Sequence, residues 1–157
     1  MEFDENKEEE KYSEDDYVDI YSKRAIFWFS FFNLIFGGVL LVINLYNAGY
    51  RKAVPAVLAF VLFFSYLSYF VIMHSGVDLQ QVVDAMNVTA KGGQPTPAQV
   101  TAMLSVAGLN IGFGLIGALI LSQFFFRRYF PDNDYYPKPV GLPILIFIIL
   151  MILTRIL

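Results

Sequence analysis

The 157-residue chain contains no cysteine and only one histidine. The lack of cysteine excludes disulfide bonds, thiolate metal sites and thiol catalysis. A single histidine, His74, lacks the partner ligands that a haem site or a proton relay requires. The motifs of zincins, P-loop NTPases and serine hydrolases are also missing. We therefore expect a protein that is not an enzyme and that holds no cofactor and no metal.

Charged residues are almost absent from four long apolar stretches, which dominate the rest of the chain. Hydrophobic residues make up 57% of the sequence, and the mean hydropathy is +0.54. Each stretch approaches the ~20 residues that cross a bilayer core as a helix, although the last is short. The sequence thus predicts an all-α integral membrane protein with four transmembrane helices in a bundle. The predicted spans are 25–46, 54–74, 98–126 and 140–157.

The acidic residues gather before the first span. Ten of the 14 acidic residues fall within residues 1–24, together with four of the 11 basic residues. Such a segment buries too little apolar surface to fold by itself. We therefore divide the chain into an acidic N-terminal tail, 1–24, predicted to be partly disordered, and a membrane domain, 25–157.

The connection between the second and third spans carries the pattern of a short interfacial helix. Its apolar residues repeat at helical spacing, which is typical of a helix lying on a membrane surface. These residues are Leu79, Val82, Val83 and Met86. Thr96 followed by Pro97 then predicts the start of the third helix, with Thr96 as its N-cap.

Small residues form a row along the third span and a pair in the first. Such rows let the backbones of neighbouring membrane helices approach closely. The predicted helix-packing residues are Thr101, Ser105, Gly108, Gly112, Gly37 and Gly38. Because four of them lie on the third span, we expect that helix to be the central one.

A short motif, Asn-x-x-Phe-Gly, occurs at 33–37 and again at 110–114. A basic turn follows each copy at a similar distance. This arrangement indicates two parallel helical-hairpin repeats, related by an axis along the membrane normal; chance matching between two apolar helices is the alternative. The basic turns are candidates for contact with anionic lipid headgroups, or they serve only to anchor the topology. Their bases are Arg51, Lys52, Arg127 and Arg128.

Three asparagines stand out inside the spans: Asn33, Asn44 and Asn110. Hydrogen bonds between membrane helices are worth about 0.6 kcal/mol each, and that role is the simpler interpretation. The alternative is that these side chains line a path for a neutral or lipid-like solute.

Four spans place both termini on the same side as the loop 75–96, with the two basic turns on the other side. Lysines and arginines near the spans then number five on the turn side and four on the terminal side. This difference is too small to fix the orientation. We therefore favour an arrangement with both termini outside only slightly.

The architecture resembles that of small bacterial membrane proteins with four spans. Coupled transporters keep ionisable groups at membrane depth, and none is present here. Our leading hypothesis is an accessory or scaffold subunit of a larger complex in the bacterial cytoplasmic membrane. It would contact the lipid bilayer and other membrane subunits or itself, and it would not bind nucleic acid. The alternative is a small homo-oligomeric transporter, channel or lipid-handling protein.

Overall fold

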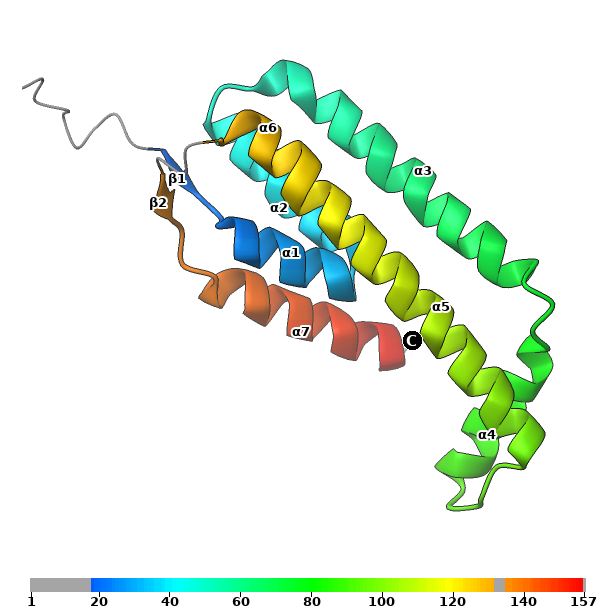
Figure 1. The fold of residues 1–157 in the computed structure, drawn as a ribbon. Coiled ribbons are helices and arrows are strands. Elements are labelled where there is room, and N and C mark those ends of the chain that lie inside the picture. Colours follow the sequence, from blue (N-terminus) through cyan, green and yellow to red (C-terminus); the bar gives the residue numbers. More distant parts are fainter. Residues whose placement is uncertain (1–17, 132–134, 157) are drawn as a thin grey trace, which may run out of the picture.

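The computed structural model describes residues 18–131 and 135–156, apart from the side chains of 154–156. Within these residues the fold is helical except for two strands of two residues each (Figure 1). The all-α prediction is confirmed. The predicted disorder of the acidic tail concerns residues that, up to residue 17, lie outside the described part of the chain.

The first predicted span is two helices, α1 (Lys23–Phe32) and α2 (Leu34–Asn47). Asn33 separates them with an extended backbone, φ −153° and ψ 105°. Its N–H donates to Phe29 O at 2.8 Å, and its side-chain Oδ1 accepts from Phe36 N at 3.0 Å. The prediction of one continuous helix over 25–46 is therefore wrong, because Asn33 ends one helix and caps the next.

The two helices form an antiparallel hairpin. Asn44, near the end of α2, bonds both backbone groups of Tyr21, just before α1: Tyr21 N donates to Oδ1 and Nδ2 donates to Tyr21 O, each at 2.8 Å. Gly37 lies so close to α1 that an added Cβ would be 2.6 Å from Ser30 Cα. At about 1.5 Å per residue, α1 is about 15 Å long and α2 about 21 Å. Neither reaches across a hydrocarbon core of ~30 Å.

The second predicted span is confirmed as a helix. A short turn of 3₁₀-helix, η2 (Arg51–Ala53), leads into α3 (Val54–Met73), which has a proline in its first turn, where a missing N–H costs no helical bond. The combined stretch Arg51–Met73 is long and apolar enough to cross a membrane, and 17% of its most apolar part is buried.

The third predicted span belongs to a longer helix. α5 (Pro97–Leu119) continues through a π-helical segment, η3 (Ile120–Phe126), into α6 (Arg127–Tyr129). Thr96 caps α5 in a capping box with Gln99, which confirms the predicted start. The 33 residues extend about 50 Å, well beyond a ~30 Å hydrocarbon core. By length and composition, this helix and the α3 stretch are the two described helices able to cross a membrane.

The predicted amphipathic helix is α4 (Leu79–Ala90), capped by Asp78, whose Oδ1 accepts from Gln80 N and Gln81 N. It buries Ala85 and packs on α5 near the start of that long helix. Figure 1 shows α4 at the opposite end of the molecule from the strands. We call this the far end.

The fourth predicted span is α7 (Gly141–Ile156), a helix of 16 residues. It follows β2 (Tyr136–Pro137), which pairs in parallel with β1 (Asp19–Ile20). The short pairing holds the start of α7 beside the start of α1 (Figure 1). The ring of Phe147 then contacts Phe29 and Phe36, with centroids 5.9 and 5.3 Å apart.

The buried core lies where α1, α2, α3 and η3 meet, near the strands. Its fully buried large side chains come from all of these elements. They are Ile20, Ile26, Leu41, Leu45, Val57, Leu121 and Phe126. Elsewhere, large apolar side chains stay exposed along α3, α5 and α7, as expected where lipid or another protein covers a surface.

The chain directions agree with the predicted repeat, but its local structure does not. α2 and α5 run toward the strands, and α3 and α7 run away from them (Figure 1). Asn33 nevertheless breaks a helix, whereas Asn110 lies inside α5 and donates to Val106 O at 2.9 Å. The two copies of the motif therefore share direction without sharing a backbone conformation.

Candidate functional site

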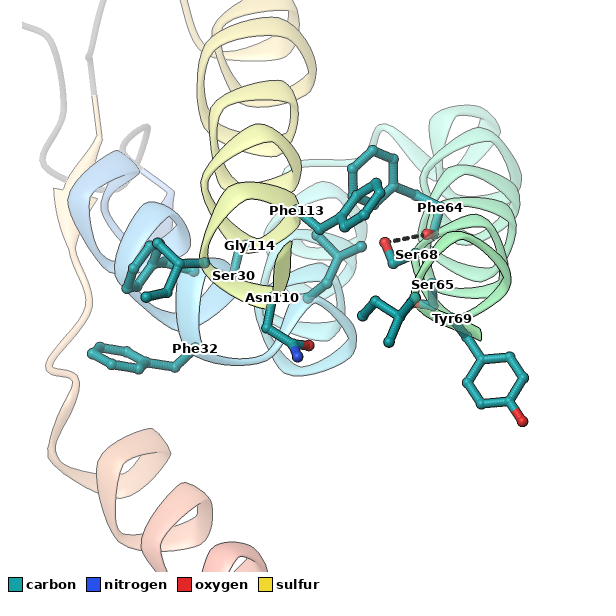
Figure 2. A pocket seen from close by; sticks show the side chains of 13 residues that line it. Ser30, Phe32, Phe64, Ser65, Ser68, Tyr69, Asn110, Phe113 and Gly114 are labelled. Carbon is teal, nitrogen blue, oxygen red and sulfur yellow. Dashed lines mark hydrogen bonds between the residues drawn. The ribbon is translucent and has the colours of Figure 1, made fainter. Parts of the chain in front are cut away.

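An open groove of about 620 Å³ lies between the tip of α1, α3 and α5 (Figure 2). Its walls are mostly aromatic and aliphatic side chains. None of its lining residues is charged, and its polar side chains come from all three helices. The polar side chains are Ser30, Ser65, Ser68, Tyr69 and Asn110.

Two of the polar side chains in the groove form hydrogen bonds within their own helices. Ser68 Oγ donates to Phe64 O at 2.7 Å, the bond drawn in Figure 2. Asn110 Nδ2 donates to the carbonyl one turn earlier in α5. Ser30 Oγ is buried without a hydrogen-bond partner among the described residues. The groove is thus suited to a neutral, mainly apolar molecule, because it offers few polar atoms and no charge.

The three predicted asparagines do not form one path. Asn33 caps α2 on the hairpin tip, and Asn44 is fully buried against the backbone of Tyr21. Only Asn110 lines the groove. Asn44 is therefore a structural residue, since its amide satisfies two buried backbone groups of Tyr21.

The predicted packing glycines of the hairpin lie at close contacts. Gly37 lies against Ser30, and a Cβ on Gly38 would be 2.6 Å from Val61 Cγ2 on α3. Glycine at both positions lets α2 approach α1 on one side and α3 on the other.

The row on α5 lies on the other side of that helix. Around Gly108 and Gly112 an added Cβ would meet nothing within 4 Å among the described residues. The glycines that α5 uses inside the fold are Gly114 and Gly117. An added Cβ would lie 2.6 Å from Phe31 O at Gly114 and 2.7 Å from Leu34 Cδ1 at Gly117. Gly114 and Gly117 were not among the predicted helix-packing residues. Their signal was the spacing of Asn110, Gly114 and Gly117, which places all three on one helix face.

The hairpin brings seven basic residues to the end of the fold that carries the strands, which we call the basic end. The ring of Tyr50, after α2, lies 5.4 Å from that of Tyr129, after η3, so the two basic turns are neighbours. Arg51 lies over the ring of Tyr46 at 4.5 Å, and Lys138 over that of Tyr21 at 5.7 Å. The seven bases are Lys23, Arg24, Arg51, Lys52, Arg127, Arg128 and Lys138. Lys91, which follows α4, lies at the far end.

His74 lies at the end of α3, where its backbone and ring are both engaged. Its ring is stacked on Phe70 at 4.1 Å, and Nδ1 is 2.9 Å from Phe70 O. Among the described residues no group of three or more histidine, cysteine or acidic side chains is placed to hold a metal ion. The described geometry gives His74 the role of closing the last turn of α3.

Comparison with known proteins adds no family or relative. No family model, no curated protein and no solved structure matches this chain.

Proposed function

We propose that this protein is a non-enzymatic, multi-pass membrane protein that acts as an accessory or scaffold subunit. Its partner surface is the row Thr101, Ser105, Gly108 and Gly112 on α5. The single observation that carries the proposal is the open space at both glycines of this row. Another transmembrane helix, from a partner subunit or from a second copy, packs there.

The physical reason lies in how helices associate in lipid. Apolar side chains gain little by leaving lipid for another apolar surface, so association depends on close backbone approach. The row faces about 200° away from Asn110, which points into the groove, because each residue turns the helix by about 100°. The row is therefore available while the opposite face of α5 packs within the chain.

The proposed orientation in the bacterial cytoplasmic membrane is based on the excess of lysine and arginine at the basic end. Cytoplasmic segments near spans carry an excess of lysine and arginine. With α1 and α2 as a hairpin that enters and leaves on one side, seven bases lie at the basic end, against Lys91 at the far end. We propose that the basic end and the N-terminal tail face the cytoplasm. This revises the slight preference for external termini, which depended on four crossings.

Thiol labelling tests this orientation, and the lack of native cysteine makes each introduced cysteine unique. Asp19→Cys, Lys52→Cys and Lys91→Cys place a thiol at three exposed positions. In intact cells, an impermeant maleimide is expected to label Cys at 91 only. After permeabilisation it should label all three. Labelling at 19 together with 91, and not with 52, would restore the four-span arrangement and exclude the hairpin.

Filling the row tests the partner surface. Gly108→Leu with Gly112→Leu is expected to lower recovery of the partner by tenfold or more, because each leucine holds the opposing backbone away. The helix itself gains, since glycine is about 1 kcal/mol worse than the best helix formers. The measurement is quantitative mass spectrometry of what co-purifies with the tagged full-length protein in mild detergent, beside co-purification of a second, differently tagged copy.

Ala56→Leu with Ala59→Leu is the matched control, because both residues are exposed on α3 and gain similar bulk. The control should keep every partner that the wild type recovers. If the α5 variant retains its partners, or if both variants lose them equally, the assigned surface is wrong.

Lipid or solute handling by a homo-oligomer is the second candidate, and the groove in Figure 2 favours it. Asn110 is the asparagine that can test this function, because it lines the groove and bonds only its own helix. Loss of flux in liposomes on Asn110→Leu, with the partner surface intact, would move the conclusion to this candidate. Asn44→Leu is unsuitable for that purpose, since it disturbs the core.

A further inference from the structure

A second cleft, of about 500 Å³, separates α7 from α1. One wall is a single face of α1, from Arg24 through Trp28 to Phe32, and the other is α7 with Ile144 and Phe147. The rings of Phe29 and Phe147 are in contact at 5.9 Å. The two helices both start at the basic end and run the same way (Figure 1), so the cleft between them extends from the basic end toward the proposed membrane interior.

The cleft is polar at one end and apolar along the rest. Ser22 and Arg24 line it at the basic end, and aromatic and aliphatic side chains line the remainder. From Ser22 to Phe32 the wall covers about 15 Å at 1.5 Å per residue. This is half of a ~30 Å hydrocarbon core, which is the depth of one leaflet. The cleft therefore has the polarity and the length of one leaflet's lipid.

The positive charge at its mouth has no counter-ion among the described residues. Arg24 is exposed and forms no ion pair there, and Lys23 precedes it on the first turn of α1. Arg24 also lines a smaller hollow of about 240 Å³ against η3, to which Lys23, Ser122 and Gln123 contribute, so Lys23 reaches the mouth of the cleft from this second hollow. Ser122 Oγ is buried without a partner among the described residues. Two bases and two further polar side chains thus surround one end of α1.

We infer that this cleft binds an anionic glycerophospholipid, with its phosphate at Lys23 and Arg24 and an acyl chain between α1 and α7. The charge of the two bases selects an anionic headgroup over a zwitterionic one. The apolar walls select a lipid over a free phosphate, which would leave them uncovered. The bound acyl chain fills the space between α1 and α7. The inference depends on the proposed membrane placement and is independent of the partner surface on α5.

The only tryptophan of the chain, Trp28, lines the cleft and reports on its occupant. Full-length protein is reconstituted in phosphatidylcholine vesicles that contain increasing fractions of a second lipid. This lipid is phosphatidylglycerol or phosphatidylcholine with brominated acyl chains, which quench tryptophan fluorescence on contact. Because a base near an anionic surface contributes about 5-fold in binding, wild-type protein should prefer brominated phosphatidylglycerol by about 5- to 25-fold.

Lys23→Gln with Arg24→Gln is expected to reduce this preference to within about twofold of unity. Arg51→Gln with Lys52→Gln is the matched control, since it removes two charges at the same end that line a different hollow. The control should keep the wild-type preference at Trp28. If the double variant at 23 and 24 does not fold, Arg24→Gln alone, at an exposed side chain, should lower the preference by about 5-fold.

Two results would overturn the inference. Equal quenching of wild-type Trp28 by both brominated lipids would mean that the cleft does not select between anionic and zwitterionic headgroups. An unchanged preference in the variants at Lys23 and Arg24, or an equal loss in the control, would place the selectivity elsewhere on the basic end.

Discussion

Gly37→Leu is expected to destabilise the protein by about 3 kcal/mol or more, because it forces α2 away from α1. An added Cβ at position 37 would overlap Ser30 Oγ and lie 2.6 Å from Ser30 Cα. The neighbour is backbone, which cannot rotate aside as a long side chain can. Leucine then adds three further carbon atoms to an interface that has no room for the first.

The loss is measured by thermal and denaturant unfolding of the full-length protein in detergent, followed by far-UV circular dichroism and by Trp28 fluorescence. Trp28 lies on α1, so its emission should shift as α1 leaves the hairpin. Gly108→Leu is the matched control, because the same substitution meets open space on α5. It should be neutral or slightly stabilising. Equal stability of the two variants would show that α1 and α2 do not pack as described.

Asn44→Leu is expected to cost about 2–6 kcal/mol, because it leaves two buried backbone groups of Tyr21 without a partner. Tyr21 N and Tyr21 O each bond the Asn44 amide at 2.8 Å, and Asn44 is fully buried. Each orphaned group costs about 1–3 kcal/mol. Leucine branches at Cγ as asparagine does and has the same number of side-chain heavy atoms, so the substitution opens no cavity; the greater bulk of its methyl groups adds to the loss.

Asn110→Leu provides the comparison for the same unfolding measurement. Asn110 is exposed and donates only within its own helix, so its replacement should change stability by less than about 0.5 kcal/mol. Limited proteolysis adds a second readout, because loss of the Asn44 bonds should release the segment before α1 for cleavage near Tyr21. A stability of Asn44→Leu within 1 kcal/mol of wild type would contradict the described role.

The hairpin links these two predictions to the proposed topology. Gly37, near the tip, packs on Ser30 of α1, and Asn44, near the base, bonds Tyr21 just before α1. If the hairpin opened into one continuous helix, Lys23 and Arg24 would move away from the other five bases. The headgroup site at α1, the cytoplasmic placement of the tail and the count of bases all depend on that reversal at Asn33.

Local features were predictable because neighbours in sequence decide them. Thr96, Pro97 and Gln99 lie within four residues, and their capping box specifies the start of α5 in any context. The periodic apolar residues of 79–86 likewise indicated α4, and the length of the second apolar stretch indicated α3. Composition by itself determined an almost wholly helical, strongly apolar chain.

The break at Asn33 could not be predicted from the same pattern, because the apolar residues continue through it and asparagine occurs inside membrane helices. Only the contacts of Gly37 with Ser30 and of Asn44 with Tyr21, seven and 23 residues apart, decide that the chain turns back. The same holds for α5, where two rows of small residues are equally visible in the sequence. Tertiary packing decided that Gly114 and Gly117 face the hairpin and that Gly108 and Gly112 stay open, because a helix can present only one of these faces to its neighbours.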